Sequence, residues 1–279
     1  MRTFHRQVLL LAMGLMALQP AAVWAQQAQE PGGEGEQLET AKEVKEEDAA
    51  AEEAEKENWL PLGVSGNVAV YTDYSFRGIS QTSRNMALQG GFDFNHDSGL
   101  FAGYWASSTN FGNTYMENDF YGGFAGTLGD LSYKASATFF YYPNDEQFNY
   151  WEFGGFGGYD FGVLSLSTGV IGSPDYFGTL GTGWYIPAGI NIPLPTISCP
   201  IPKGKDCISP ALNANGGYTH TEERIVSNAQ HYWDWNAGLV LTLPFNFALD
   251  FRYVGTDVND VVPDGDAGDR FIFGAKYSF

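Results

Sequence analysis

The chain has 279 residues and a net charge of −19, yet only 17% of its residues are charged. Soluble domains usually carry about 25% charged residues, whereas this chain is rich in Gly (35), Phe (21), Tyr (16) and Trp (7). This composition argues against an ordinary soluble enzyme. Beyond the N-terminal segment no apolar run approaches the roughly 20 residues of a spanning helix. The alternatives are a soluble exported protein and a closed β-barrel, and the aromatic content favours the barrel.

The first 25 residues have the pattern of a secretory signal peptide. Arg2 and Arg6 precede a short apolar run over residues 8–18, Pro20 interrupts it, and small residues lead to Ala25. This pattern predicts export with cleavage after Ala25. A transmembrane anchor is the alternative, but the run is too short to span a bilayer.

Residues 26–58 form a second segment of distinct composition. Between Glu30 and Glu57 there are 12 acidic residues, three Lys and no aromatic residue. Leu38 and Val44 are too few aliphatic positions for a coiled-coil seam. We therefore expect an acidic low-complexity spacer in the periplasm, either flexible or a solvated helix over residues 40–56. A tether to the cell wall or to a partner is the alternative role.

From Trp59 onward, apolar and polar residues alternate with a period of two, which is the pattern of strands with one apolar face. The prediction for residues 59–279 is an all-β fold, a transmembrane antiparallel β-barrel of about 12 strands. An even number is typical of single-chain bacterial barrels, and ten or fourteen strands remain alternatives. The expected strands are residues 64–76, 86–96, 99–109, 116–128, 131–142, 148–159, 161–171, 176–190, 211–220, 231–243, 246–255 and 270–279.

The connections between these strands alternate in length, as short periplasmic turns and longer outer loops do in such barrels. The tight turns are at residues 96–99, 128–130, 160 and 244–245. An insertion at 191–210 breaks the rule and contains Cys199 and Cys207, which in an oxidising compartment favour a local disulfide. The last outer loop carries Asp257, Asp260, Asp264, Asp266 and Asp269. These carboxylates either lie on a solvated surface or bridge through a divalent cation to lipopolysaccharide.

The alternation assigns a face to each strand residue. On the first strand Val64, Val68, Val70, Tyr74 and Phe76 are expected to face lipid. A ring of inward charges has two interpretations: a cation-favouring constriction, or paired charges that fill the barrel. Residues 59–279 carry 21 acidic and 9 basic residues, so pairing is incomplete and we expect the surplus acids to be solvated. The predicted lumen-lining residues are Asp73, Arg77, Asp93, Glu117, Asp119, Lys134, Glu152, Asp250 and Arg252.

The chain stops at an alternating aromatic strand. Phe271, Phe273, Tyr277 and Phe279 share one face, opposite Ile272, Gly274, Lys276 and Ser278. A terminal strand of this kind resembles the C-terminal recognition signal of outer-membrane proteins. We therefore expect the barrel-assembly machinery to be a partner.

Residues 64–69 (VSGNVA) and 73–82 (DYSFRGISQT) resemble the opening of the TorF family of exported proteobacterial porins, and residues 89–93, 103–107 and 141–143 continue the likeness. The resemblance implies an outer-membrane barrel with a porin role and says little about substrate. The acidic spacer and the Pro/Cys insertion depart from the family pattern. Within the matching stretch, Arg77 is expected at the outer end of the first strand. It either guards the pore mouth, binding an anionic group of a solute, or pairs with an inward Asp beside a turn that Gly78 permits.

The function predicted from these features is a porin-like channel of the cell outer membrane for passive or selective passage of small solutes, with a preference for cations. A structural or adhesive barrel with partner-binding loops is the alternative. A barrel enzyme acting on lipid is the weaker alternative, because His220 and His231 flank a loop with Thr221 and Ser227 but no nucleophile motif accompanies them. Expected partners are outer-membrane lipid, lipopolysaccharide and small solutes. No cofactor, metal or nucleic acid is expected.

Overall fold

A computed structural model describes residues 62–198, 206–225, 229–258 and 266–279. The predicted signal peptide at 1–25 and the acidic spacer at 26–58 lie outside the described residues. Within them, no helix is long and apolar enough to cross a membrane.

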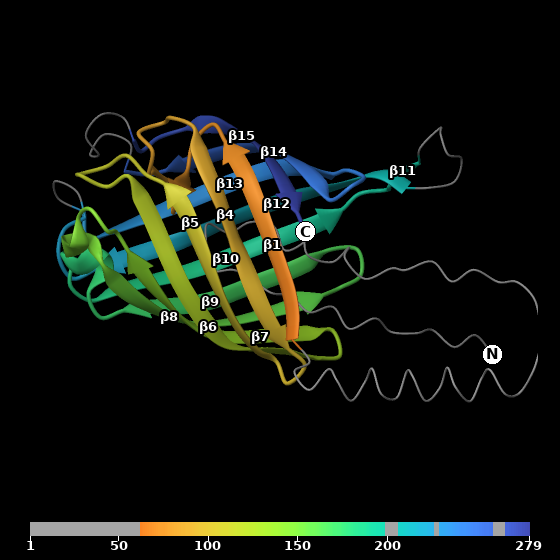
Figure 1. Cartoon of the computed structure of the whole chain (residues 1–279), viewed down its shortest axis with the longest axis horizontal. Coiled ribbons are helices and arrows are strands. Elements are labelled where there is room, and N and C mark those ends of the chain that lie inside the picture. Colours follow the sequence, from red (N-terminus) through yellow and green to blue (C-terminus); the bar gives the residue numbers. More distant parts are fainter. Residues whose placement is uncertain (1–61, 199–205, 226–228, 259–265) are drawn as a thin grey trace, which may run out of the picture.

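The described chain forms a closed antiparallel barrel, which confirms the predicted fold class (Figure 1). Each strand pairs with its neighbour in the chain, β1 pairs with β15, and β10 pairs with β12. A short strand, β11 (Ile197–Ser198), pairs only with β12 and stands outside the ring. The twelve barrel strands are β1 (Leu62–Tyr71), β4 (Ala87–His96), β5 (Leu100–Ser108), β6 (Met116–Leu128), β7 (Leu131–Tyr141), β8 (Tyr150–Asp160), β9 (Ser165–Ser173), β10 (Gly183–Pro193), β12 (Asp206–Thr221), β13 (His231–Thr242), β14 (Phe247–Thr256) and β15 (Arg270–Ser278).

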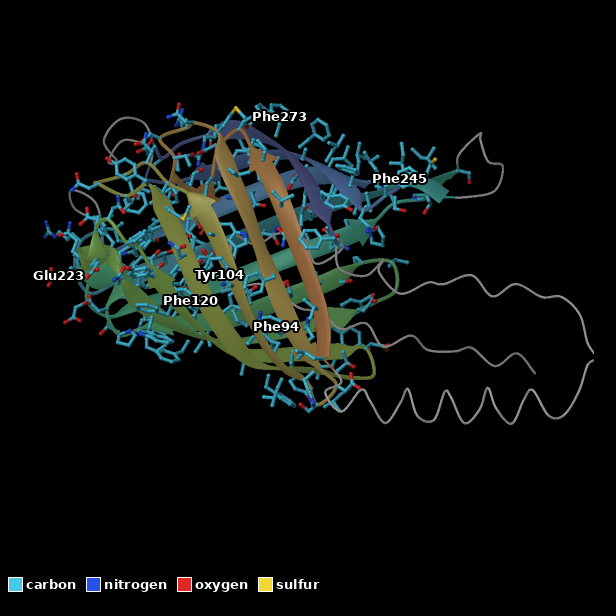
Figure 2. The ribbon with its side chains drawn as sticks, in the orientation of Figure 1. Phe94, Tyr104, Phe120, Glu223, Phe245 and Phe273 are labelled. Carbon is cyan, nitrogen blue, oxygen red and sulfur yellow. The ribbon has the colours of Figure 1, made fainter. Side chains whose placement is uncertain are left out.

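Alternate residues of each strand point away from the lumen. Many of these outward residues are apolar, so the outer surface of the barrel is apolar. Aromatic side chains from adjacent strands contact one another on this surface, as do Tyr104 and Phe120, whose ring centroids are 5.2 Å apart. Figure 2 shows these two residues with Phe94 on three neighbouring strands. The final strand follows the same rule, since Phe271, Phe273, Tyr277 and Phe279 are all exposed.

The last residue helps to close the barrel. Phe279 and Gly66 exchange two backbone hydrogen bonds, of 2.7 and 2.9 Å. A Cβ atom at Gly66 would lie 2.6 Å from the ring of Phe279. The glycine therefore leaves the space in which the terminal ring packs against β1.

The two ends of the barrel differ as the connection lengths predicted. At one end the turns are tight, as between Leu128 and Leu131, which pair directly across a two-residue turn containing Gly129 with φ 64°. Figure 2 labels Phe245 at this end, in the β13–β14 turn, and Glu223 at the opposite end with the longer connections. Which end faces the periplasm stays a prediction.

The first predicted strand is too long, and this error matters for the site. β1 ends at Tyr71, and the chain then turns into the barrel, where β2 (Ser75–Phe76) and β3 (Ile79–Ser80) form a separate two-stranded sheet. Tyr74 and Phe76, expected to face lipid, are instead buried, at 2% and 5% exposure. Apolar and polar residues alternate through residue 76. Beyond Tyr71, however, the alternating side chains lie on the two faces of a hairpin inside the barrel, not toward lipid and lumen.

A similar correction applies to the predicted strand at 176–190. β10 begins only at Gly183, because residues Tyr176–Gly178 form a short 3-10 helix, η3. Tyr176 in η3 is buried. The connection between β9 and β10 therefore also contributes to the inside of the barrel.

Candidate functional site

The residues between β1 and β4 build a compact inner hairpin, defined here as residues 73–82. Arg77 and Gly78 form its turn with φ values of 47° and 83°, and positive φ at both positions is the requirement of a type I′ hairpin turn. The carboxylate of Asp73 accepts hydrogen bonds from the hydroxyls of Ser80, at 2.5 Å, and Thr82, at 2.8 Å. These side-chain bonds hold the base of the hairpin, because two strands alone are marginally stable.

The inner hairpin crosses the barrel from wall to wall. In the strand order, β8 and β10 lie on the side of the ring opposite β1. Arg77 nevertheless reaches Glu152 on β8, with N–O distances of 2.8 and 2.9 Å. A Cβ atom at Gly78 would lie 2.9 Å from Cβ of Thr256 on β14, and Arg270 on β15 forms an ion pair with Asp73.

An aromatic core packs around the hairpin inside the barrel. The ring of Tyr74 meets Trp105 edge-on at 5.5 Å, and Phe76 meets Phe140 at 6.1 Å. A smaller cluster around Tyr232 packs against Ile79 in the same hairpin. The main cluster of buried residues is Tyr74, Phe76, Ala87, Trp105, Phe140, Tyr142, Tyr150 and Tyr176. The core of this barrel therefore lies inside its lumen, at the end with the longer connections.

Acidic side chains on the wall beside the hairpin are held by hydroxyl and guanidinium groups. Glu117 on β6 accepts hydrogen bonds from the hydroxyls of Tyr74, at 2.7 Å, and Tyr142. Burial raises the pKa of both tyrosines, which lie outside the barrel strands, well above that of a free side chain. Both hydroxyls therefore keep their protons and act as donors to Glu117. Glu152 instead accepts a hydrogen bond from the guanidinium of Arg77.

Asp119 differs from its acidic neighbours. Its side chain on β6 has 0% exposure, and neither carboxylate oxygen has a hydrogen-bond partner among the described residues. The hydroxyl of Thr138 on adjacent β7 is also buried without a partner. The sequence led us to expect surplus carboxylates in contact with solvent, and at Asp119 the structure departs from that expectation. Buried polar groups without partners are costly and rare in native proteins.

We predict that Asp119→Asn stabilises the barrel. The change replaces an ionisable carboxylate that has no described partner by an uncharged amide of the same shape. The amide also lacks a described partner but costs less to bury than a charged group, so we expect a gain of about 1 kcal/mol. Urea unfolding of the refolded protein in lipid vesicles would measure the free energy of unfolding. The matched change Glu117→Gln should destabilise the protein, because Glu117 accepts two tyrosine hydroxyls. A stability loss in Asp119→Asn would contradict the prediction.

A second charged group lies farther from the hairpin. Asp93 on β4 accepts a hydrogen bond from Tyr121, and Lys134 on β7 lies 4.8 Å above the ring of Phe101. Lys276 on β15 is also buried and interacts electrostatically with Asp93. Our prediction of lumen residues did not include Lys276, although the alternation of the last strand places it on the face opposite the aromatic residues.

Asp250 and Arg252 complete the charged residues predicted for the lumen. They form an ion pair at 2.9 Å on β14, and Arg252 also donates to Asn236 on β13 and Asn213 on β12. All nine predicted residues are thus buried or half-buried. The structure divides them into a group at the hairpin (Asp73, Arg77, Glu117, Asp119, Glu152) and a group beyond it (Asp93, Lys134, Asp250, Arg252). Whether they line a conducting lumen stays a prediction.

Arg77 itself lies elsewhere than we expected. It is at the tip of the inner hairpin rather than at the outer end of a wall strand, and its partner is Glu152 rather than an aspartate. Three aromatic rings surround its guanidinium: those of Phe76, Tyr176 and Tyr185, at 4.7, 5.2 and 4.1 Å from the guanidinium carbon.

The other predicted sites lie apart from this group. Cys207 near the start of β12 is disulfide-bonded, whereas Cys199 is outside the described residues, so the Cys199–Cys207 pairing stays a prediction. His220 and His231 are cross-strand partners, and the hydroxyl of Thr221 donates to the carbonyl of Glu223. No set of three or more His, Cys, Asp or Glu in the described ranges is placed to hold a metal ion.

Comparisons with known proteins add a family match. A family model described as "Bacterial protein of unknown function (Gcw_chp)" matches residues 55–277. This description does not carry the TorF name, so that resemblance stays a prediction. A search of curated proteins found no match.

Solved barrels resemble the fold only distantly. The KdgM porin gives a TM-score of 0.48 at 8% identity, covering 77% of this chain and 99% of that chain. The NanC porin gives 0.48 at 9%, covering 77% and 98%. LpxR from Salmonella typhimurium gives 0.44 at 10%, covering 77% and 99%. At scores and identities this low, we draw nothing about function from these structures.

Proposed function

Because the chain belongs to the Gcw_chp family of bacterial proteins of unknown function, we propose its role from its own geometry: a selective channel of the cell outer membrane. In this proposal small solutes pass through the barrel, and the inner hairpin narrows its outer end. Outer-membrane lipid, lipopolysaccharide and the barrel-assembly machinery are its proposed partners.

The observation that carries the proposal is the contrast between the two surfaces of the barrel. Outside, the strands present large apolar residues such as Val64, Phe153 and Phe273 to their surroundings. Inside, they carry Asp93, Lys134 and other charged groups. An apolar exterior with a polar, charged interior is the arrangement of barrels that surround an aqueous path.

The direction of selectivity follows from the charges beside the hairpin. Glu117 and Asp119 lie on wall strand β6 and Glu152 lies on β8, with β7 between the two strands. Arg77 is paired only with Glu152. These side chains are buried beside the hairpin, so a solute that passes this level comes close to more acidic than basic groups without contacting them directly. Acidic rings of this kind favour cations, so we propose a preference for cationic solutes.

Conductance of the refolded barrel in a planar bilayer, with unequal salt on its two sides, tests both statements. We expect small steady steps and a reversal potential on the cation side. The double variant Glu117→Gln, Asp119→Asn should move the reversal potential toward zero, because it removes two carboxylates from the narrow level. Asp250→Asn, in the group of charges away from the hairpin, is the matched control and should change it less.

Two outcomes would count against this function. A bilayer that stays silent with folded wild-type protein argues against conduction. Equal selectivity of the wild type and the double variant argues that Glu117 and Asp119 are structural rather than selective. Heat-dependent gel mobility, which reports a folded barrel, should be checked for each protein.

A further inference from the structure

The surroundings of the Arg77 guanidinium form a cation-binding environment built by the barrel wall. Glu152 on β8 supplies both carboxylate oxygens, at 2.8 and 2.9 Å from one guanidinium nitrogen. The ring of Tyr185 on β10 lies 4.1 Å from the guanidinium carbon, and Tyr176 in η3 lies 5.2 Å from it. Aromatic faces around a cation, together with a carboxylate, are the usual means of binding ammonium and guanidinium groups.

This environment contains carboxylate and hydroxyl oxygens that make no described hydrogen bond to Arg77. Asp234 on β13 interacts electrostatically with Arg77 and accepts a hydrogen bond from Tyr185 at 3.2 Å. Its second carboxylate oxygen and the hydroxyl of Tyr150 are both buried without a partner in the described part of the chain. Two carboxylates, Glu152 and Asp234, therefore lie beside a single guanidinium, and two buried polar atoms without a described partner are left for a bound ligand to contact.

The residue that occupies this environment comes from a separate and strained element. Arg77 has a φ of 47°, a conformation unfavourable for a residue other than Gly, Asn or Asp. Its hairpin shares no strand ladder with the barrel. Strain of this kind persists only where surrounding contacts hold it, and it is common at switch regions.

We propose that Glu152, Asp234, Tyr176 and Tyr185 form a binding site for the guanidinium or alkylammonium group of a small solute, and that Arg77 occupies this site in the structure as an internal competitor. This inference rests on the proposed channel and names its solute class. A solute cation that binds here takes the place of Arg77 and frees the tip of the inner hairpin.

The test is chemical rescue of a protein that lacks the internal competitor. Arg77→Asn removes the guanidinium and produces an Asn–Gly pair, the preferred sequence for this turn; Arg77→Gly serves if that variant does not fold. Methylguanidinium and methylammonium chloride at millimolar concentration are added to detergent-refolded protein, and thermal unfolding is followed by circular dichroism. We expect both salts to raise the Tm of Arg77→Asn by several degrees beyond KCl, and to leave the wild-type Tm nearly unchanged.

Four control variants identify the site. Adding Glu152→Gln to Arg77→Asn should abolish the rescue, and adding Tyr185→Leu should weaken it, whereas adding Tyr185→Phe keeps the ring and should preserve it. Arg252→Ala also removes an arginine from a carboxylate partner, Asp250, but without a described ring contact, and should show little rescue. Absence of rescue, rescue that survives Glu152→Gln, or equal rescue of Arg252→Ala would overturn the proposal. Because binding is measured in detergent, this result is independent of whether the bilayer conducts.

Discussion

Removing the inner hairpin should raise single-channel conductance several-fold. The hairpin contacts wall residues on β5, β8 and β14 and Tyr176 in η3, so its removal takes away a segment that spans the lumen at that level. Barrels of this strand number lie between those filled by side chains and those with open channels. Filling by a chain segment is therefore expected to decide how much solute passes.

The barrel offers a clean way to make this change. Tyr71 at the end of β1 and Ala87 at the start of β4 are direct cross-strand partners, so residues 72–86 can be replaced by an Asn–Gly turn without moving either strand. Planar-bilayer recording of this variant and of the wild type under the same salt gives the comparison.

The comparison must distinguish a barrel that fails to fold from a folded barrel whose lumen is closed at another level. Heat-dependent gel mobility checks that the shortened barrel folds, and a double variant in the hairpin, Phe76→Ser with Ile79→Ser, keeps the chain length while weakening both apolar contacts. If both proteins fold and both conduct as little as the wild type, the lumen is closed at another level and the hairpin is not the constriction.

The strands were predictable because their signal is local. Alternation within ten residues is enough to assign both the strand and its inward face, and this placed Glu117, Asp119 and Glu152 on the inner wall together. Strand ends were less accurate, as at β10, because Tyr176 and the residues after it continue an apolar pattern that a short helix uses instead.

The inner hairpin was not predictable in the same way. Its anchors join residues far apart in the chain, with Asp73 and Arg270 separated by 197 positions and Arg77 and Glu152 by 75. No periodic pattern records such pairs. The Arg77–Gly78 dipeptide was a turn signal, but it gave no indication that the turn lies inside the barrel rather than at its rim.

The burial of Asp119 also could not be predicted from the sequence. Its place on the inner face of β6 follows from alternation, and counting charges showed that some carboxylates lack a basic partner. Only the packing of the hairpin shows that this acid is sealed from solvent. The natural sequence thus keeps a costly buried group beside the inner hairpin.

The ion pair between Arg77 and Glu152 should show strong coupling in a double-mutant cycle. Side-chain exposure is 6% for Arg77 and 1% for Glu152. Removing Arg77 leaves Glu152 buried without its countercharge, and removing Glu152 leaves the guanidinium with only Asp234, to which it forms no described ion pair. Each of Arg77→Met and Glu152→Gln should therefore lower the free energy of unfolding by about 3–5 kcal/mol. The double variant should lose much less than the sum, because neither charge then remains to be left unpaired.

The Arg252–Asp250 pair provides the comparison within the same lumen. Its N–O distance of 2.9 Å is close to that of the first pair, but both side chains are 11% exposed, and water screens the interaction more. We expect the coupling energy from Arg252→Met and Asp250→Asn to be smaller than that of the hairpin pair, with urea unfolding in vesicles measuring both cycles. Additive losses for Arg77 and Glu152 would mean that aromatic packing, not the ion pair, holds the hairpin tip. In that case a cation that competes for Glu152 would not displace the hairpin tip. The double-mutant cycle therefore tests whether competition for Glu152 can release the hairpin.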